Sequence, residues 1–247
     1  MSAIEEVRSH LLRVYPPEAV DDMIPAIEAL WQGYENPTRA HQSLTERDVA
    51  LITYGDQVAE TDIPKLQTLR AFLDEHLREV VTLVHLLPFY PYSSDDGFSV
   101  IDYYQVRSDL GDWDAVRAFT GSFDLMFDAV INQMSAESEW FQKYLADARE
   151  YKDFFIDGTD FKNLDLVTRP RTSPLLHQFN DKRVWTTFSC DQVDLNYAHP
   201  QVMLRILDLL LFYASHGAKA IRLDAIGFMW KEDGTTSIHL PEAHELI

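Results

Sequence analysis

The motif Ile221-Arg222-Leu223-Asp224-Ala225 sets a cation and a carboxylate two residues apart at the end of an apolar run. Side chains at positions i and i+2 of a strand point to the same face, so Arg222 and Asp224 are expected to project together. A neighbouring cation lowers the pKa of a carboxyl group and keeps it ionised. An ionised, fixed carboxylate can attack an anomeric carbon and form a glycosyl-enzyme. The alternative interpretation is a structural Arg–Asp ion pair at the end of a strand.

A second apolar run ends in the segment Asp128-Ala-Val-Ile-Asn132-Gln133-Met-Ser135. Asn132 and Gln133 carry amide donors and acceptors of the kind that bind sugar hydroxyls. Asp128 lies deeper in the run, where it either orients a neighbouring arginine or is buried and satisfied by backbone groups. Taken alone, this motif favours a structural role over a functional one.

Two further segments, residues 88–98 and 188–196, mix aromatic and acidic side chains. Carboxylates beside aromatic faces suit a sugar, which needs both hydrogen-bond acceptors and an apolar platform. The alternative is that each segment is a loop that packs on its own aromatic residues.

The motifs of other kinds of site are absent from the sequence. The nine histidines show no HExxH or CxxC spacing, and there is no glycine-rich phosphate loop, so neither a zinc site nor a nucleotide site is predicted.

The elements that must position these residues follow a regular order. Unbroken apolar runs alternate with helical stretches, which is typical of a parallel sheet in an α/β fold. The runs are residues 49–54, 80–87, 123–131 and 218–223, and the helical stretches are residues 63–77, 112–120 and 201–216. Each run ends in polar residues, at the place where a (β/α) barrel builds its active site and where an open sheet binds ligands. This pattern alone does not choose between the two.

The domain organisation is predicted from what lies around these runs. Residues 1–48 form an N-terminal extension of two helices and a polar linker over residues 35–46, and residues 49–247 form the α/β part. The aromatic-rich residues 134–199 are too long for a simple loop and indicate an inserted subdomain. A closed barrel needs eight strand–helix units in about 250 residues, whereas four are recognisable here. We therefore expect a fragment that ends inside the next helix.

Composition excludes several classes of function. With 21 basic and 40 acidic residues, the net charge of −19 opposes binding to nucleic acid or to an anionic membrane surface. A single cysteine, Cys190, forbids an internal disulfide and fits a reducing compartment. The acidic, polar start is no secretory signal, and the most apolar stretch, residues 202–214, is too short to span a bilayer. We expect a soluble, cytoplasmic protein.

Taken together and in this order, the motifs resemble the α-amylase family of retaining glycoside enzymes (glycoside hydrolase family 13), and within it the sucrose phosphorylase group. DAVINQMS and IRLDA are similar to the first two conserved regions of the family, while HLLPFYPYSSDDGF, the Arg-Pro-Arg at 169–171 and VWTTFSCDQVDLN are typical of the group. The N-terminal extension and the segment HLLPFYPYSSDDGFSVIDYY are more similar to glucosylglycerate phosphorylases than to sucrose phosphorylases. The resemblance covers residues 49–247 and implies a (β/α)8 TIM barrel, of which this chain holds about the first four units.

The resemblance also implies an activity. Such enzymes transfer a glucosyl group from a small-molecule glucoside to inorganic phosphate through a covalent glucosyl-enzyme and release α-D-glucose 1-phosphate. Asp224 matches the nucleophile, and Arg222 matches its partner arginine. The residues matching the glucose subsite are Asp95, Phe98, Asn132, Gln133, Phe188 and Gln192. The group uses phosphate as a co-substrate, so no cofactor and no metal are expected.

Two departures from the family pattern bear on activity. The family has histidine where this chain has Gln133, which can donate a hydrogen bond but cannot become cationic. The general acid/base glutamate of the family lies beyond the fourth strand and is absent here, since Glu242 and Glu245 follow Asp224 too closely. The chain alone is therefore expected to be inactive. The alternatives are a hydrolase or transglucosidase of the same family, or a non-catalytic sugar-binding half-barrel.

Overall fold

A computed structural model describes residues 2–34 and 45–247 of the chain. Most of the predicted linker, residues 35–46, lies outside the described residues. The two predicted N-terminal helices are present as α1 (Ala3–Leu11) and α2 (Pro17–Gly33). A capping box starts α1, in which the Ser2 backbone N–H donates to the Glu5 carboxylate at 2.7 Å. As predicted, Pro17 occupies the first turn of α2, where its missing N–H costs nothing.

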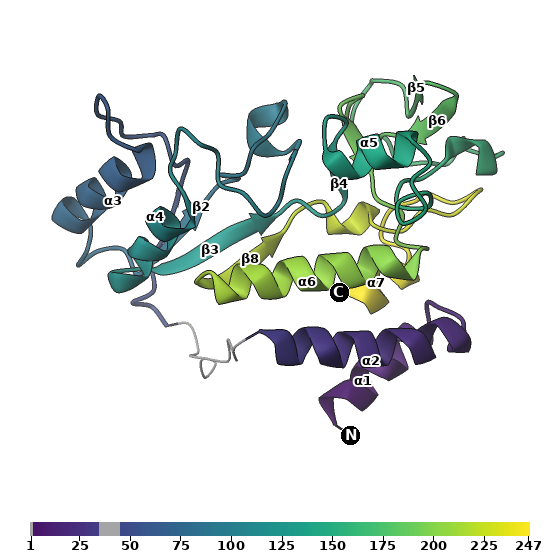
Figure 1. Cartoon of the computed structure of the whole chain (residues 1–247), viewed down its shortest axis with the longest axis horizontal. Coiled ribbons are helices and arrows are strands. Elements are labelled where there is room, and N and C mark those ends of the chain that lie inside the picture. Colours follow the sequence, from purple (N-terminus) through teal and green to yellow (C-terminus); the bar gives the residue numbers. More distant parts are fainter. Residues whose placement is uncertain (1, 35–44) are drawn as a thin grey trace.

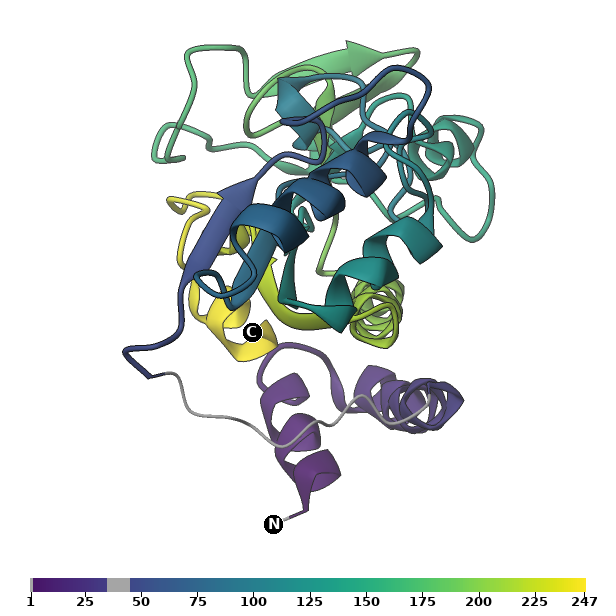
Figure 2. The ribbon, with the colours of Figure 1, turned by 90° about the vertical axis from the view of Figure 1, so that its left-hand side faces the viewer.

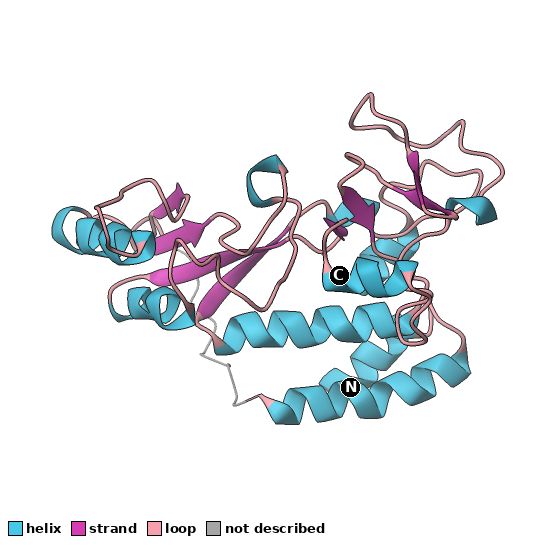
Figure 3. Ribbon diagram, turned by 45° about the horizontal axis from the view of Figure 1, so that its top comes forward, coloured by secondary structure: helices cyan, strands magenta, loops and turns pink. Residues whose placement is uncertain are grey.

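The central element is a parallel sheet of four strands in the order β1-β2-β3-β8 (Figures 1 and 3). The strands are β1 (Ala50–Thr53), β2 (Leu83–Leu86), β3 (Asp124–Ala129) and β8 (Ala218–Leu223). All four fall within the predicted apolar runs. The second strand is shorter than its predicted run of residues 80–87 by more than any other strand. Val80, at the start of that run, lies before the strand and is 59% exposed.

Helices cover one face of this sheet. They are α3 (Lys65–His76), α4 (Trp113–Arg117) and α6 (Pro200–Ser215), and a further helix, α7 (Pro241–Leu246), follows β8. Val84 and Leu86 of β2 and their neighbours Leu125 and Phe127 of β3 are fully buried beneath them. On the opposite face Ile52 is 62% exposed. A parallel sheet with its helices on one face agrees with the predicted partial (β/α) barrel, and the described residues form four parallel strands of it.

The predicted insertion contains small elements beyond the C-terminal ends of β3 and β8 (Figure 1). Strand β4 (Gln133–Ser135) pairs antiparallel with β7 (Gln192–Asp194). Helix α5 (Glu139–Leu145) and the hairpin of β5 (Leu176–Phe179) and β6 (Lys182–Trp185) complete it. The insertion therefore stands over the edge of the sheet where the polar strand ends gather. The exact domain boundaries stay predictions.

The N-terminal helices pack along α6 and reach α7 (Figures 1 and 2). The Tyr15 hydroxyl donates to the backbone oxygen of Tyr197 at 2.7 Å, and His10 of α1 contacts Glu245 of α7 at 2.7 Å. The extension is thus attached to the outer side of the α/β part, away from the strand ends. Within the described residues, no helix is long and apolar enough to cross a membrane.

Candidate active site

A cavity of about 430 Å³ opens between the strand ends and the insertion. It gathers six of the eight predicted site residues from distant parts of the chain. These are Asp95, Phe98, Gln133, Phe188, Gln192 and Asp224. Three lining residues were not predicted from the sequence, namely Arg171, Ala225 and Phe228. The cavity has the mixed character expected of a sugar site, with carboxylates and amides beside aromatic rings.

Asp224 is held at the cavity by an ion pair with Arg222. The Arg222 Nη2 lies 2.9 Å from Asp224 Oδ1, as the same-face prediction required. The other guanidinium nitrogen, Nη1, pairs with Asp128, which is fully buried. Asp128 also accepts a hydrogen bond from His85 Nε2 at 2.7 Å. Of the two interpretations left open for Asp128, orientation of an arginine is therefore the correct one.

The direction of the pKa shift of Asp224 differs from the sequence-based expectation. Burial is the largest influence and raises the pKa of this carboxyl group, whereas Arg222 lowers it as predicted. The nearby carboxylates of Asp128 and Asp95 raise it further. The net pKa lies above its ordinary value, so the prediction of a lowered pKa is wrong. The sequence could not show how far the insertion removes this group from water.

The loop that carries Asp95 and Phe98 is tightly folded. Asp95, Asp96 and Gly97 all have positive φ angles, of 55°, 51° and 104°. A Cβ on Gly97 would lie 2.8 Å from the Cβ of Pro88, so only glycine fits this backbone without movement. The Gln192 amide donates to Asp95 Oδ2 at 2.9 Å and to the Phe98 backbone oxygen at 3.0 Å. The insertion thereby holds the loop after β2.

Gln133, at the position where the resemblance expects histidine, is largely engaged by the protein. Its Nε2 donates to the Phe98 backbone oxygen at 3.2 Å, and its Oε1 accepts from Asn132 Nδ2 at 2.9 Å. One N–H of this amide is therefore left to face the cavity. Asn132 itself is fully buried behind Gln133 and does not line the cavity.

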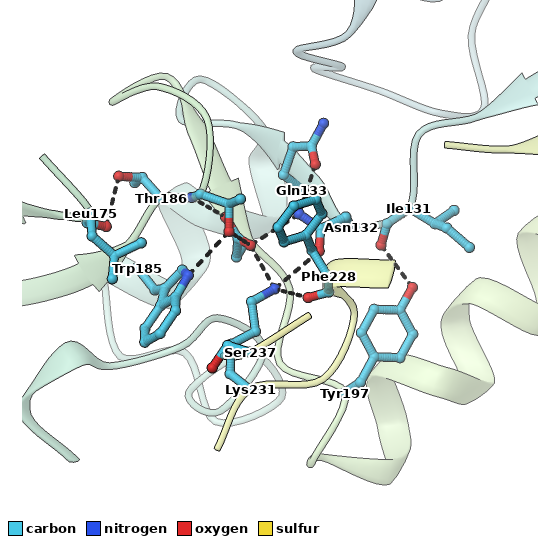
Figure 4. Close-up of polar contacts among 12 residues, drawn as sticks. Ile131, Asn132, Gln133, Leu175, Trp185, Thr186, Tyr197, Phe228, Lys231 and Ser237 are labelled. Carbon is cyan, nitrogen blue, oxygen red and sulfur yellow. Dashed lines mark hydrogen bonds and ion pairs between the residues drawn. The ribbon is translucent and has the colours of Figure 1, made fainter. Parts of the chain in front are cut away.

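Behind Asn132 lies a buried ion pair that sequence reasoning missed (Figure 4). The Lys231 ammonium lies 2.6 Å from Asp194 Oδ2 and 3.0 Å from Asn132 Oδ1, and it also bonds to the backbone oxygen of Phe228. Asp194 accepts a further hydrogen bond from the Thr187 backbone N–H at 2.8 Å. Burial lowers the pKa of Lys231, while Asp194 opposes that shift. This pair ties the loop after β8 to the insertion.

The unpredicted lining residues add a cation and a second aromatic face. The Phe228 and Phe188 rings meet edge to face, with centroids 5.5 Å apart. Arg171 is 58% exposed, and its Nη2 lies 4.0 Å from Asp95 Oδ1. Arg171 belongs to the Arg-Pro-Arg segment, which was noted in the sequence as typical of the group but was assigned no role in the site. Within residues 2–34 and 45–247, no cluster of three or more His, Cys, Asp or Glu could hold a metal ion.

Comparison with known proteins places this geometry in a family. The family model described as "Alpha amylase, catalytic domain" matches residues 75–246. The chain is 46% identical over 259 residues to a glucosylglycerate phosphorylase of Spirochaeta thermophila, an alignment that covers 100% of this chain and 44% of that protein. It is 50% identical over 207 residues to the glucosylglycerate phosphorylase of Escherichia coli, covering 82% and 37%.

A solved structure agrees with these relatives. The sucrose 6F-phosphate phosphorylase from Thermoanaerobacter thermosaccharolyticum superposes with a TM-score of 0.74 at 28% identity, covering 83% of this chain and 45% of that one. The chain therefore spans less than half the length of the relatives that it matches. Because the catalytic-domain model matches most of the sequence, the chain belongs to the α-amylase family.

Proposed function

We propose that this chain supplies the nucleophile and the glucosyl-binding side of a retaining α-glucoside phosphorylase. The observation that carries the proposal is Asp224, fixed by Arg222 in a cavity that also presents Asp95 and aromatic rings. The named activities of the relatives support the phosphorylase reaction over others in the family. The products would be α-D-glucose 1-phosphate and the free aglycone.

The proposed reaction has two displacements at the anomeric carbon. In the first, an Asp224 carboxylate oxygen attacks this carbon, and the bond to the aglycone oxygen breaks as that oxygen takes a proton from a general acid. In the second, a phosphate oxygen attacks the same carbon and releases Asp224. A retaining enzyme needs its two carboxyl groups about 5–5.5 Å apart. We propose that the acid/base glutamate is supplied by residues outside this sequence.

The cavity walls suit the two parts of the substrate. Asp95 and Gln192 would bind glucosyl hydroxyls, while the rings of Phe98 and Phe188 would pack on the sugar. Arg171 also lines the cavity and, unlike Arg222, does not pair with Asp224. A guanidinium binds phosphate or carboxylate oxygens in a planar fork. The residue would therefore bind the phosphate or an anionic aglycone. No metal and no cofactor are needed for these steps.

A glucosylglycerate is our proposed donor. The two glucosylglycerate phosphorylases share 46% and 50% identity with this chain, whereas a glucosylglycerol phosphorylase and a sucrose phosphorylase share 31% and 34%. Glycerate carries a carboxylate that glycerol and fructose lack, and Arg171 offers it a partner. Comparing donors with and without that carboxylate tests this finer assignment directly.

Covalent labelling of this chain tests the nucleophile without needing the general acid. A 5-fluoro-α-glucosyl fluoride has a leaving group that departs unprotonated, so Asp224 alone can form the adduct. We expect one glucosyl adduct in the intact mass, located by peptide mapping at Asp224 and absent from Asp224→Asn. Asp165→Asn, a change at an exposed aspartate, is the matched control and should label as the unchanged chain does.

Several results would count against the proposal. An adduct on another residue, or none on a folded chain, would contradict Asp224 as the nucleophile, and saturable sugar binding without labelling would favour a non-catalytic role. For a chain that turns over, the ratio of glucose 1-phosphate to free glucose in the presence of phosphate separates a phosphorylase from a hydrolase. A product mixture dominated by free glucose would favour the hydrolase.

A further inference from the structure

Asp191 is surrounded by serine hydroxyls next to the candidate site, although it does not line the cavity. Its Oδ2 accepts hydrogen bonds from the hydroxyls of Ser93 at 2.5 Å and Ser99 at 2.8 Å. The Ser94 hydroxyl donates to the same oxygen. The Ser135 hydroxyl donates to Oδ1 at 3.2 Å. Burial alone would raise the pKa of Asp191, but the four hydroxyls together lower it. The carboxylate therefore remains ionised and accepts all four hydrogen bonds.

These serines lie on both sides of the tight turn described above. Ser93 and Ser94 precede residues 95–97, and Ser99 follows them. Positive φ angles at two consecutive aspartates are unfavourable, because their Cβ atoms crowd the backbone. Such a conformation persists only where the surroundings hold it. Asp191 joins the two ends of the turn through a single carboxylate oxygen and so holds it closed.

The turn carries two of the cavity-lining residues. Asp95 and Phe98 reach the cavity from it, and Gln192, the neighbour of Asp191, bonds to both of them. Two adjacent residues of the insertion thus hold one loop, Asp191 through its serines and Gln192 through its cavity side. Neither Asp191 nor the serines contribute to the cavity lining, so their effect on a ligand must pass through the loop.

We propose that Asp191 is a positioning residue that fixes Asp95 and Phe98 for contact with the glucosyl group. The loop-closing part of this inference rests on the geometry alone, whereas its effect on sugar binding rests on the proposed function. Removal of the carboxylate frees the serine hydroxyls to bond with water, and the turn then relaxes toward negative φ angles. Asp95 would move away from Gln192, and the cavity would lose a hydrogen-bond acceptor for the sugar.

Amide hydrogen exchange tests the loop-closing role. The variants are Asp191→Ala, Asp191→Asn and Ser94→Ala, with Asp165→Ala at an exposed aspartate as the control. In Asp191→Ala we expect exchange of the Ser93 and Phe98 amides to accelerate by about tenfold or more, since each now bonds within the turn. Amides in β3 should keep their rates. Asp191→Asn and Ser94→Ala, which retain part of the cluster, should show smaller changes in the same direction.

Titration with α-D-glucose 1-phosphate tests the effect on binding in the same variants. We expect Asp191→Ala to bind about tenfold more weakly, Asp191→Asn to fall in between, and the control to bind as the unchanged chain does. Unchanged exchange at Ser93 and Phe98 would overturn the loop-closing role. Faster exchange with unchanged affinity would overturn the positioning role. If the unchanged chain does not bind the ligand, the proposed function fails, while the exchange rates still decide whether Asp191 holds the loop.

Discussion

Asp128 and Arg222 are register partners in the adjacent parallel strands β3 and β8, and their side chains form an ion pair on the face of the sheet opposite the helices. Asp224 follows two residues later, directly after the end of β8, and pairs with the second nitrogen of the guanidinium. Its backbone N–H donates to the Ala129 oxygen at the end of β3 at 3.0 Å, so the pairing of β3 with β8 sets the position of the candidate nucleophile. Two adjacent strands are enough to build this part of the site.

Replacing Arg222 with lysine should slow covalent labelling of Asp224. A single ammonium cannot bridge Asp128 and Asp224 as the planar guanidinium does, so the carboxylate loses its fixed orientation. A misplacement of about 1 Å costs roughly 100-fold in rate, and we expect a decrease of that order in the labelling rate. Arg117→Lys, at an exposed pair with Asp114, should leave the rate unchanged. An unaffected rate in Arg222→Lys would contradict the orienting role.

Replacing Lys231 with methionine should strongly destabilise the chain. The change leaves the Asp194 side chain buried without its cation, a defect that costs about 3–5 kcal/mol. The free energy of unfolding, measured by urea titration, gives the value. Lys219→Met is the matched control, because Lys219 pairs with Asp124 where both side chains are about one-third exposed, and such a pair contributes about 0–1 kcal/mol. Equal losses in the two variants would show that burial of the Lys231 pair has no special weight.

Replacing Asp224 with asparagine should raise the melting temperature at pH 7. The pKa of Asp224 is raised in the folded chain, so its favourable contribution to stability is present below the ordinary value of 3.8 and is lost as the pH rises through the folded pKa. At neutral pH the ionised group destabilises the fold, and asparagine removes that charge while still bonding to Arg222. Thermal melts across a pH series should show the advantage narrowing as the pH falls. A lower melting temperature at pH 7 would refute the predicted shift.

Replacing Asp191 with asparagine should have the opposite effect. Its pKa is lowered in the folded chain, so the ionised group stabilises the fold above the ordinary value of 3.8, and this contribution is lost as the pH falls through the folded pKa. The variant should therefore melt at a lower temperature than the unchanged chain at pH 7, and the two should converge in acid. The same pH series measures both aspartates, and an equal sign for the two variants would contradict one of the two pKa directions.

Local patterns predicted the sheet and the pairing of Arg222 with Asp224 well, because both depend on neighbouring residues; the role of Asp224 as the nucleophile stays a prediction. The spacing of Arg222 and Asp224 required them to share a face, and they do. The features that could not be predicted from the sequence depend on contacts between residues far apart in the chain. The buried Lys231 pairs with Asp194 of the insertion, and the pKa of Asp224 is raised by burial and by the carboxylates of Asp128 and Asp95 from other parts of the chain. His85 lies in a strand that was predicted, but its hydrogen bond to Asp128 could not be, because Asp128 belongs to a different strand.

The attachment of α1 has a consequence for synthesis of the chain. His10 bonds to a residue 235 positions later, and Arg13 bonds to the same glutamate, Glu245, at a separation of 232. A ribosome adds about 5–20 residues per second, so the first helix emerges roughly 10–50 s before its final partner exists. Helix α2 can pack on α6 before α7 is synthesised, whereas the ion-pair contacts of α1 with α7 form only after Glu245 has been added.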